Sequence, residues 1–82
     1  MNVNKTIQLG NQCKIELGKS TWDKDEDSIR LRFENSNGGF NVHASSELPI
    51  WGLNELMKAW VGHGEVNSQQ AGELIKLLAQ KL

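Results

Sequence analysis

The sequence predicts a small α+β domain, namely a four-stranded antiparallel β-meander followed by two C-terminal α-helices packed on one face of the sheet. Apolar residues recur at every second position up to about Ala44, which is typical of half-buried strands. From there to Leu82 they recur at every third or fourth position, which is typical of amphipathic helices. A chain of 82 residues has the length of one domain. We therefore expect a single unit over residues 1–82, with strands within 1–45 and helices within 46–62 and 67–82.

Three strands are predicted in the first half of the chain. The apolar alternation covers residues 7–9 and resumes over residues 13–17, and the tight turn between them is formed by Gly10 and Asn11, which tolerate positive φ. Residues 18–28 are polar and are predicted to form a loop. The alternation returns over residues 29–33, so a third strand is expected there.

The fourth strand is predicted over residues 40–44. It follows residues 35–39, a run of Asn, Ser and Gly that accepts turn conformations. The alternation places Phe40, Val42 and Ala44 on the apolar face of the sheet, and Asn41 and His43 on the outer face.

The first helix is predicted to begin with Ser46 as its N-cap, because Pro49 is tolerated in a first turn, and an alternative start lies near Gly52. One face carries its apolar residues, which are Leu53, Leu56, Met57 and Trp60. The helix should end at residues 62–64, a Gly-His-Gly sequence, since glycine is common just past a helix C-terminus.

The second helix has stronger start signals. Asn67 and Gln70 have the spacing of a capping box, and Val66 and Ala71 occupy the positions of a hydrophobic staple. Gly72 weakens the helix by about 1 kcal/mol relative to alanine. The apolar stripe continues to the last residue and consists of Ala71, Leu74, Ile75, Leu78 and Leu82.

The composition narrows the class of partner. Nine basic and ten acidic residues give a net charge of −1, without the basic stripe that nucleic-acid binding usually needs. The single Cys13 rules out an intrachain disulfide and favours a reducing compartment, so a cytoplasmic location is expected. No stretch has the apolar length of a signal peptide or a membrane span, so no membrane partner is expected.

The candidate metal and catalytic groups are weak. The alternating carboxylates of residues 23–27, with Glu34, follow the ligand spacing of a calcium loop of the EF-hand type, but Ser28 stands where that loop needs glycine. Cys13, His43 and His63 lack the close pairing of a zinc site. Cys13 falls on the apolar strand face and His63 at a helix C-terminus, where each has a structural role. We expect no catalytic residue, no bound metal and no cofactor.

The remaining candidates indicate an interaction surface. The outer sheet face should carry mixed charges, and Trp22 and Trp51 fall in irregular segments, whereas Trp60 fits the core side of the first helix. The predicted surface comprises Lys14, Glu16, Trp22, Arg30, Arg32, His43 and Trp51. The leading hypothesis is a small non-enzymatic interaction protein of inhibitor, immunity or adaptor type that binds another protein, and a bacterial or phage origin suits a chain of this size.

Two other functions and one assembly state stay open. A nucleic-acid-binding module would use the basic residues of the sheet face, which are Lys14, Arg30, Arg32 and, beside them, Lys19. A small calcium-binding or enzymatic protein would use the acidic loop 23–27. Leu77 lies off the main stripe of a leucine-rich helix, so a homodimer that buries the surplus apolar surface is also predicted.

Overall fold

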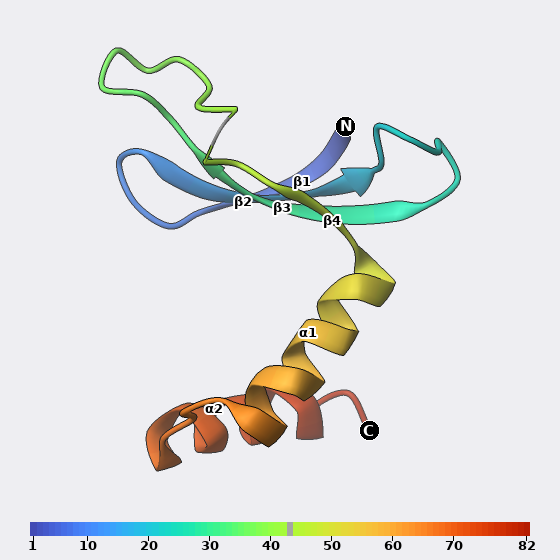
Figure 1. Cartoon of the computed structure of the whole chain (residues 1–82), viewed down its shortest axis with the longest axis vertical. Coiled ribbons are helices and arrows are strands. Elements are labelled where there is room, and N and C mark those ends of the chain that lie inside the picture. Colours follow the sequence, from blue (N-terminus) through green and yellow to red (C-terminus); the bar gives the residue numbers. More distant parts are fainter. Residues whose placement is uncertain (43) are drawn as a thin grey trace.

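A computed structural model, which describes residues 1–42 and 44–82, confirms the predicted fold class (Figure 1). His43, predicted on the outer sheet face, lies outside these residues. The sheet is antiparallel in the order β1-β2-β3-β4, and two helices follow it. The elements are β1 (Asn2–Gln8), β2 (Cys13–Lys19), β3 (Asp27–Phe33), β4 (Glu47–Pro49), α1 (Ile50–His63) and α2 (Ser68–Ala79).

The register of the sheet gathers the apolar side chains on one face, as the alternation predicts. Ile7 on β1 pairs with Ile15 on β2, which pairs with Leu31 on β3. Leu17, Ile29 and Leu48 form the next row across β2, β3 and β4. We call this side of the sheet the apolar face; the opposite side is the outer face.

The fourth strand lies elsewhere than predicted. Residues 40–42 and 44, which the structure describes, form no strand, and Phe40 makes an isolated bridge with Glu34. Instead, residues 47–49, expected in the first turn of a helix, pair with residues 28–30 as the edge strand β4. Pro49 is tolerated there because an edge strand leaves one row of backbone groups unpaired. Phe40, in the segment after β3, lies instead against Arg30 and Arg32 on the outer face.

Helix α1 therefore begins later than predicted and without the expected cap. Its first residue is Ile50, its N-cap position is Pro49, and no side chain accepts a hydrogen bond there. Ser46 as an N-cap is wrong because β4 lies between it and the helix. The predicted end is confirmed, since Gly64 is the C-cap and its N–H donates to the carbonyl oxygen of Trp60 at 2.8 Å.

Helix α2 begins as predicted. The N–H of Gln70 donates to Asn67 Oδ1 at 2.8 Å, and the N–H of Asn67 donates to Gln70 Oε1 at 3.2 Å, so the capping box is present. The helix ends at Ala79, three residues before the end of the predicted stripe. Local side-chain chemistry determines this start, which explains why it could be predicted.

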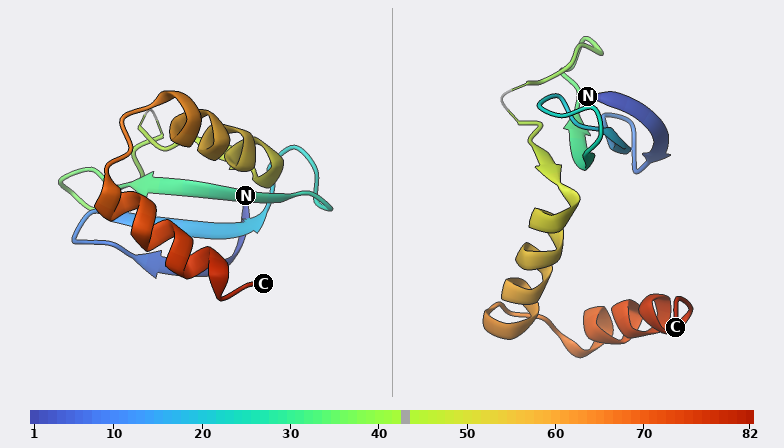
Figure 2. Two further views of the ribbon diagram at one scale, coloured as in Figure 1. Left: turned by 90° about the horizontal axis from the view of Figure 1, so that it is seen from below. Right: turned by 90° about the vertical axis from the view of Figure 1, so that its right-hand side faces the viewer.

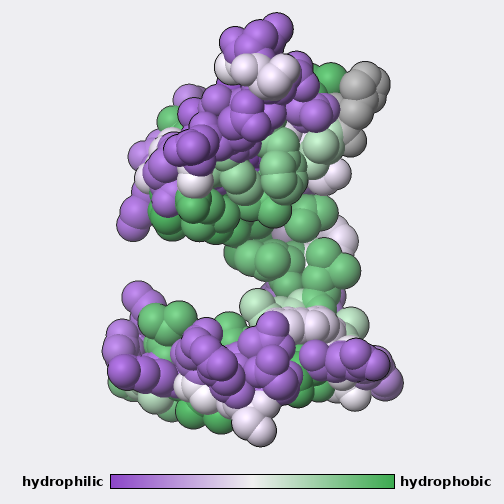
Figure 3. All heavy atoms as spheres, turned by 90° about the vertical axis from the view of Figure 1, so that its left-hand side faces the viewer, coloured by the Kyte–Doolittle hydropathy of each residue, from purple (hydrophilic) through white to green (hydrophobic). Residues whose placement is uncertain are grey.

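Both helices lie on the apolar side of the sheet, but only α1 touches it. Helix α1 contacts β3 and β4 and then leads away from them. Helix α2 crosses below β1 and β2 at the far end of α1 (Figure 2), without a close backbone approach to any strand in the described residues. The space-filling view shows an open gap between the apolar face and α2 (Figure 3). Trp60, expected in the core, is exposed.

Candidate protein-interaction surfaces

The outer face of the sheet holds a charged network centred on Glu16. The register of β2 and β3 places Glu16 opposite Arg30. Arg30 donates from Nε at 3.0 Å and from Nη2 at 2.6 Å to Glu16 Oε1, while Nη1 of Arg32 lies 3.5 Å from Glu16 Oε2. The side chains of Glu16 and Arg30 are only 5% and 13% exposed. Buried charges are stable only with close partners of opposite charge, so these ion pairs join β2 and β3 at the centre of the outer face.

Phe40 covers this charged network. Its ring centre lies 4.7 Å from the guanidinium carbon of Arg30 and 4.3 Å from that of Arg32, so one ring makes cation–π contacts with both. The bridge to Glu34 and the hydroxyl of Ser45, which accepts from the N–H of Phe33 at 2.9 Å, attach this segment to β3. The outer face is therefore partly covered by its own chain rather than fully solvated.

Lys14 also has an internal partner. Its Nζ lies 3.4 Å from Glu34 Oε1, beside the covered network. Lys14, Glu16, Arg30 and Arg32, four of the predicted surface residues, are thus brought together on one face, with their charges paired to each other or to Glu34. That they meet a partner stays a prediction.

A second cluster joins the two predicted surface tryptophans. The indole N–H of Trp22 donates to Glu26 Oε2 at 2.8 Å, and that of Trp51 donates to Glu26 Oε1 at 3.0 Å. Trp22 lies in the loop between β2 and β3, whereas Trp51 lies in the first turn of α1. The residues are 51% and 68% exposed. One carboxylate therefore fixes two exposed indoles side by side, and we call Trp22, Glu26 and Trp51 the tryptophan pair site.

The loop that carries Trp22 is anchored by Glu47 on β4. Thr21 donates to this carboxylate from its N–H at 3.0 Å and from its hydroxyl at 2.7 Å, and the buried Ser28 hydroxyl donates at 2.9 Å. Burial acts to raise the pKa of Glu47, but the hydrogen bonds from Thr21 and Ser28 together outweigh it, so the pKa lies below its ordinary value. The terminal ammonium of Met1 also donates to Thr21 Oγ1, at 2.8 Å. Hydrogen bonds to Glu47 thus fix the loop of the tryptophan pair site to β4.

The carboxylates of loop 23–27 point to different partners. Asp23 Oδ1 accepts from the N–H of Asp25 at 2.9 Å, Glu26 accepts from the two indoles, and Asp27 Oδ1 lies 2.6 Å from Lys19 Nζ. The hydrogen bond and charge of Asp27 raise the pKa of Lys19. Among the residues that the structure describes, no three His, Cys, Asp or Glu side chains are arranged to hold a metal ion.

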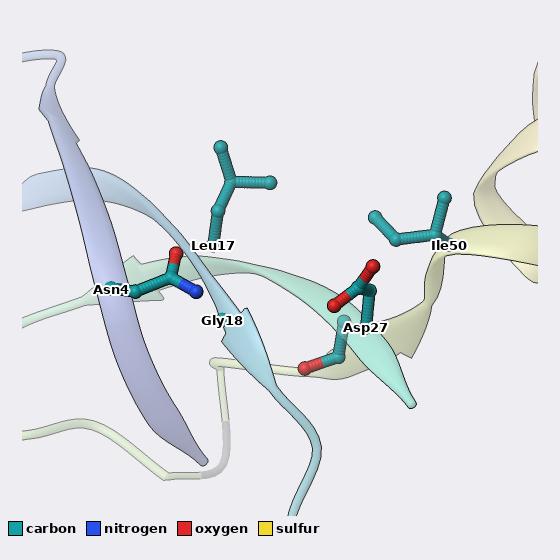
Figure 4. A pocket seen from close by; sticks show the side chains of 6 residues that line it. Asn4, Leu17, Gly18, Asp27 and Ile50 are labelled. Carbon is teal, nitrogen blue, oxygen red and sulfur yellow. The ribbon is translucent and has the colours of Figure 1, made fainter. Parts of the chain in front are cut away.

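A hollow of about 270 Å³ opens where β1 bulges between Val3 and Lys5 (Figure 4). Its lining is mixed, and consists of Asn4, Leu17, Gly18, Asp27, Ser28 and Ile50. The start of β1 passes so close to Gly18 that a Cβ atom there would collide with the carbonyl oxygen of Asn2. The lining brings together no nucleophile and base, because Asp27 is paired with Lys19 and Ser28 donates to Glu47.

The other residues considered from sequence lie apart from these clusters. Cys13 is a free, half-buried thiol at the start of β2, and His63 is the basic residue in the last turn of α1. Sequence reasoning missed Glu26, Glu47 and Phe40. Glu26 stands four residues after Trp22, which is a weak signal, whereas the partners of Glu47 and Phe40 lie far away in the sequence.

The chain matches no protein-family model, and no similar chain is found among curated proteins or solved structures. Over residues 1–42 and 44–82, neither helix has the length and apolar character needed to cross a membrane.

Proposed function

We propose that this chain is a small, non-enzymatic cytoplasmic protein of inhibitor, immunity or adaptor type, which binds another protein through the tryptophan pair site. The observation that carries the proposal is the pair of exposed indoles held by Glu26. Tryptophan is enriched among residues that dominate binding energy at protein interfaces. Because the indole N–H groups are already satisfied, the ring surfaces are left to contact a partner.

Rigidity supports this use of the site. A side chain that is ordered before binding loses less conformational entropy when the partner arrives. Glu26 holds both rings, and Glu47 holds the backbone of Thr21 next to Trp22, so the two indoles are preorganised. The free thiol of Cys13 supports a reducing compartment.

The charged network supports a protein partner over a nucleic acid. Arg30 and Arg32 contact Glu16, and Phe40 covers their guanidinium groups. A phosphate would have to displace these contacts, and phosphate neutralisation supplies most non-specific nucleic-acid affinity. Binding to single-stranded or duplex DNA at low salt that is lost in Arg30→Ala would favour the nucleic-acid alternative.

Affinity capture with the purified chain, from a lysate of the source cell, tests the proposal. A protein retained by the wild-type chain should be lost with Trp22→Ala and with Trp51→Ala, since truncating a central tryptophan costs about 2 kcal/mol or more, roughly 30-fold in Kd. Lys58→Ala is the matched control, because it removes only an exposed 3.3 Å ion pair with Glu55 on α1. Capture that is equally strong with all three variants, each shown to be folded, would contradict the site.

A further inference from the structure

Residues 1–42 and 44–82 form no buried hydrophobic core. In the described part of the chain no hydrophobic residue is buried, and the buried polar residues are Glu16, Ser20 and Ser28. Yet 38% of the sequence is hydrophobic, which is near the ordinary range for a globular domain. Burial of apolar surface is the dominant favourable term in folding. A fold that leaves this apolar surface in water is therefore expected to bury it against another protein surface.

Part of the uncovered apolar surface lines two hollows, one at each side of the gap between the sheet and α2. At one end the sheet and the start of α1 enclose a hollow of about 200 Å³, lined by Ile15, Ile29, Leu31, Leu48 and Leu53. At the other end the corner between the helices encloses about 230 Å³, lined by Met57, Val61, Val66, Ala71, Leu74, Ile75 and Leu78. The open gap between sheet and α2 separates the two (Figure 3). Figure 3 also shows apolar residues gathered on the sheet side of this gap and along α1.

Residues 64–67 join the two helices, and both of the helix ends that meet there are capped. Gly64 caps α1, and a Cβ atom at this position would lie 2.6 Å from the carbonyl oxygen of Trp60. The capping box at Asn67 fixes the start of α2 only three residues later. Val66, between the two caps, contributes to the apolar lining of the corner. The connection between the helices is therefore short, and local hydrogen bonds fix the helix end on each side of it.

The solvent-exposed area of the chain is larger than that of a compact monomer of the same mass. A folded monomer of 9.2 kDa is expected to expose about 4,900 Å², whereas this chain exposes 6366 Å², an excess of about 1,450 Å². Its radius of gyration is 14.5 Å, against about 12 Å expected for a compact chain of 82 residues. Two chains that bury this excess against each other would hide about 2,900 Å² in total, which lies in the range of obligate homodimers.

We propose that a second copy of this chain fills the gap, so that two hooked chains interlock about a twofold axis. Helix α2 of each chain lies between the sheet and α2 of the other, and the apolar residues of the two corners meet. Such an interface is isologous and requires a surface that complements itself. The apolar walls on both sides of the gap meet this requirement, and a net charge of −1 per chain opposes association very little. The tryptophan pair site is not part of this interface.

Sedimentation and thermal unfolding test the assembly. A species of about 18 kDa, twice the chain mass of 9.2 kDa, should dominate at micromolar concentration. The melting temperature should rise with protein concentration over roughly 1 to 100 µM, because folding and association are coupled. A folded 9.2 kDa monomer with a concentration-independent melting temperature would overturn the proposal.

Cross-linking tests the exchange of helices. In a Cys13→Ser background, one chain carries Leu31→Cys on the apolar face and another carries Ile75→Cys on α2; both native side chains are exposed. After the two chains are refolded together, a short bifunctional thiol reagent should give a cross-linked product of twice the chain mass. A chain that carries both cysteines should likewise give mostly the dimeric product. A predominantly intrachain product would show that each α2 covers its own sheet and would overturn the proposal.

Discussion

Glu16→Gln should destabilise the protein strongly, although it preserves the volume of the side chain. The variant removes the negative charge that contacts Arg30 at 2.6 Å and Arg32 at 3.5 Å, and leaves two guanidinium groups side by side beneath Phe40. Breaking a buried ion pair costs about 3 to 5 kcal/mol. Because the side chains of Arg30 and Arg32 are 13% and 25% exposed, water solvates part of their charge and reduces this cost, so we expect a loss of about 3 kcal/mol in the free energy of unfolding.

Urea unfolding of wild-type and variant chains at one fixed protein concentration measures this loss. For a domain of this size, 3 kcal/mol corresponds to a decrease in melting temperature of about 12 to 24 °C. Lys58→Ala is the control, since it breaks an exposed pair and should change the free energy of unfolding by about 0.5 kcal/mol or less. A loss below about 1 kcal/mol in Glu16→Gln would refute the view that this network organises the outer face.

Three further changes test other parts of the structure. The pKa of Glu47 in the folded state lies below its ordinary value of 4.5, so the ionised carboxylate stabilises the folded chain above pH 4.5, and this stability is lost as the pH falls through the folded pKa. The difference in unfolding free energy between wild type and Glu47→Gln should therefore shrink below about pH 4. A difference that stays constant with pH would contradict the hydrogen bonds from Thr21. Gly18→Ala should cost about 1 to 3 kcal/mol in the same unfolding assay, because the new methyl group would meet the backbone of Asn2; a neutral effect would mean that β1 lies elsewhere. Asn67→Ala should lower stability by about 1 kcal/mol through loss of the capping box, and unchanged helicity and stability would count against that cap.

The sequence pattern predicted best what neighbouring residues determine. The start of α2 at Ser68 follows from Asn67 and Gln70, which satisfy each other within one turn. The end of α1 follows from Gly64 in the same way. Strands β2 and β3 follow from a period-2 alternation that runs over several residues, because a one-residue shift would move every side chain to the wrong face. The prediction was wrong for the bounds of β1, which runs over Asn2–Gln8 and not over residues 7–9, because residues 2–6 carry no such alternation.

The pattern failed where the structure depends on residues distant in sequence. Phe40, Val42 and Ala44 alternate like a strand, yet Phe40 leaves the apolar face because two guanidinium groups from β3 attract its ring. Residues 47–49 resemble a helix start but pair with β3, where Glu47 lies opposite Arg30 and accepts from Thr21. The tryptophan pair site was predicted as two separate residues, since nothing local to Trp51 indicates that Glu26 joins it to Trp22.

The apolar period shows which face of an element is buried, but not against which chain. Met57 and Leu74 follow the helical period that we assigned to one shared core, and in the structure they line an open corner. A domain of this size gains little margin from its own core, so leaving that corner in water would remove much of its stability. The apolar stripe therefore predicts a buried surface whether that surface packs against the chain's own sheet or against a second copy. The exposed area of 6366 Å², well above that of a compact chain of this mass, favours burial against a second copy.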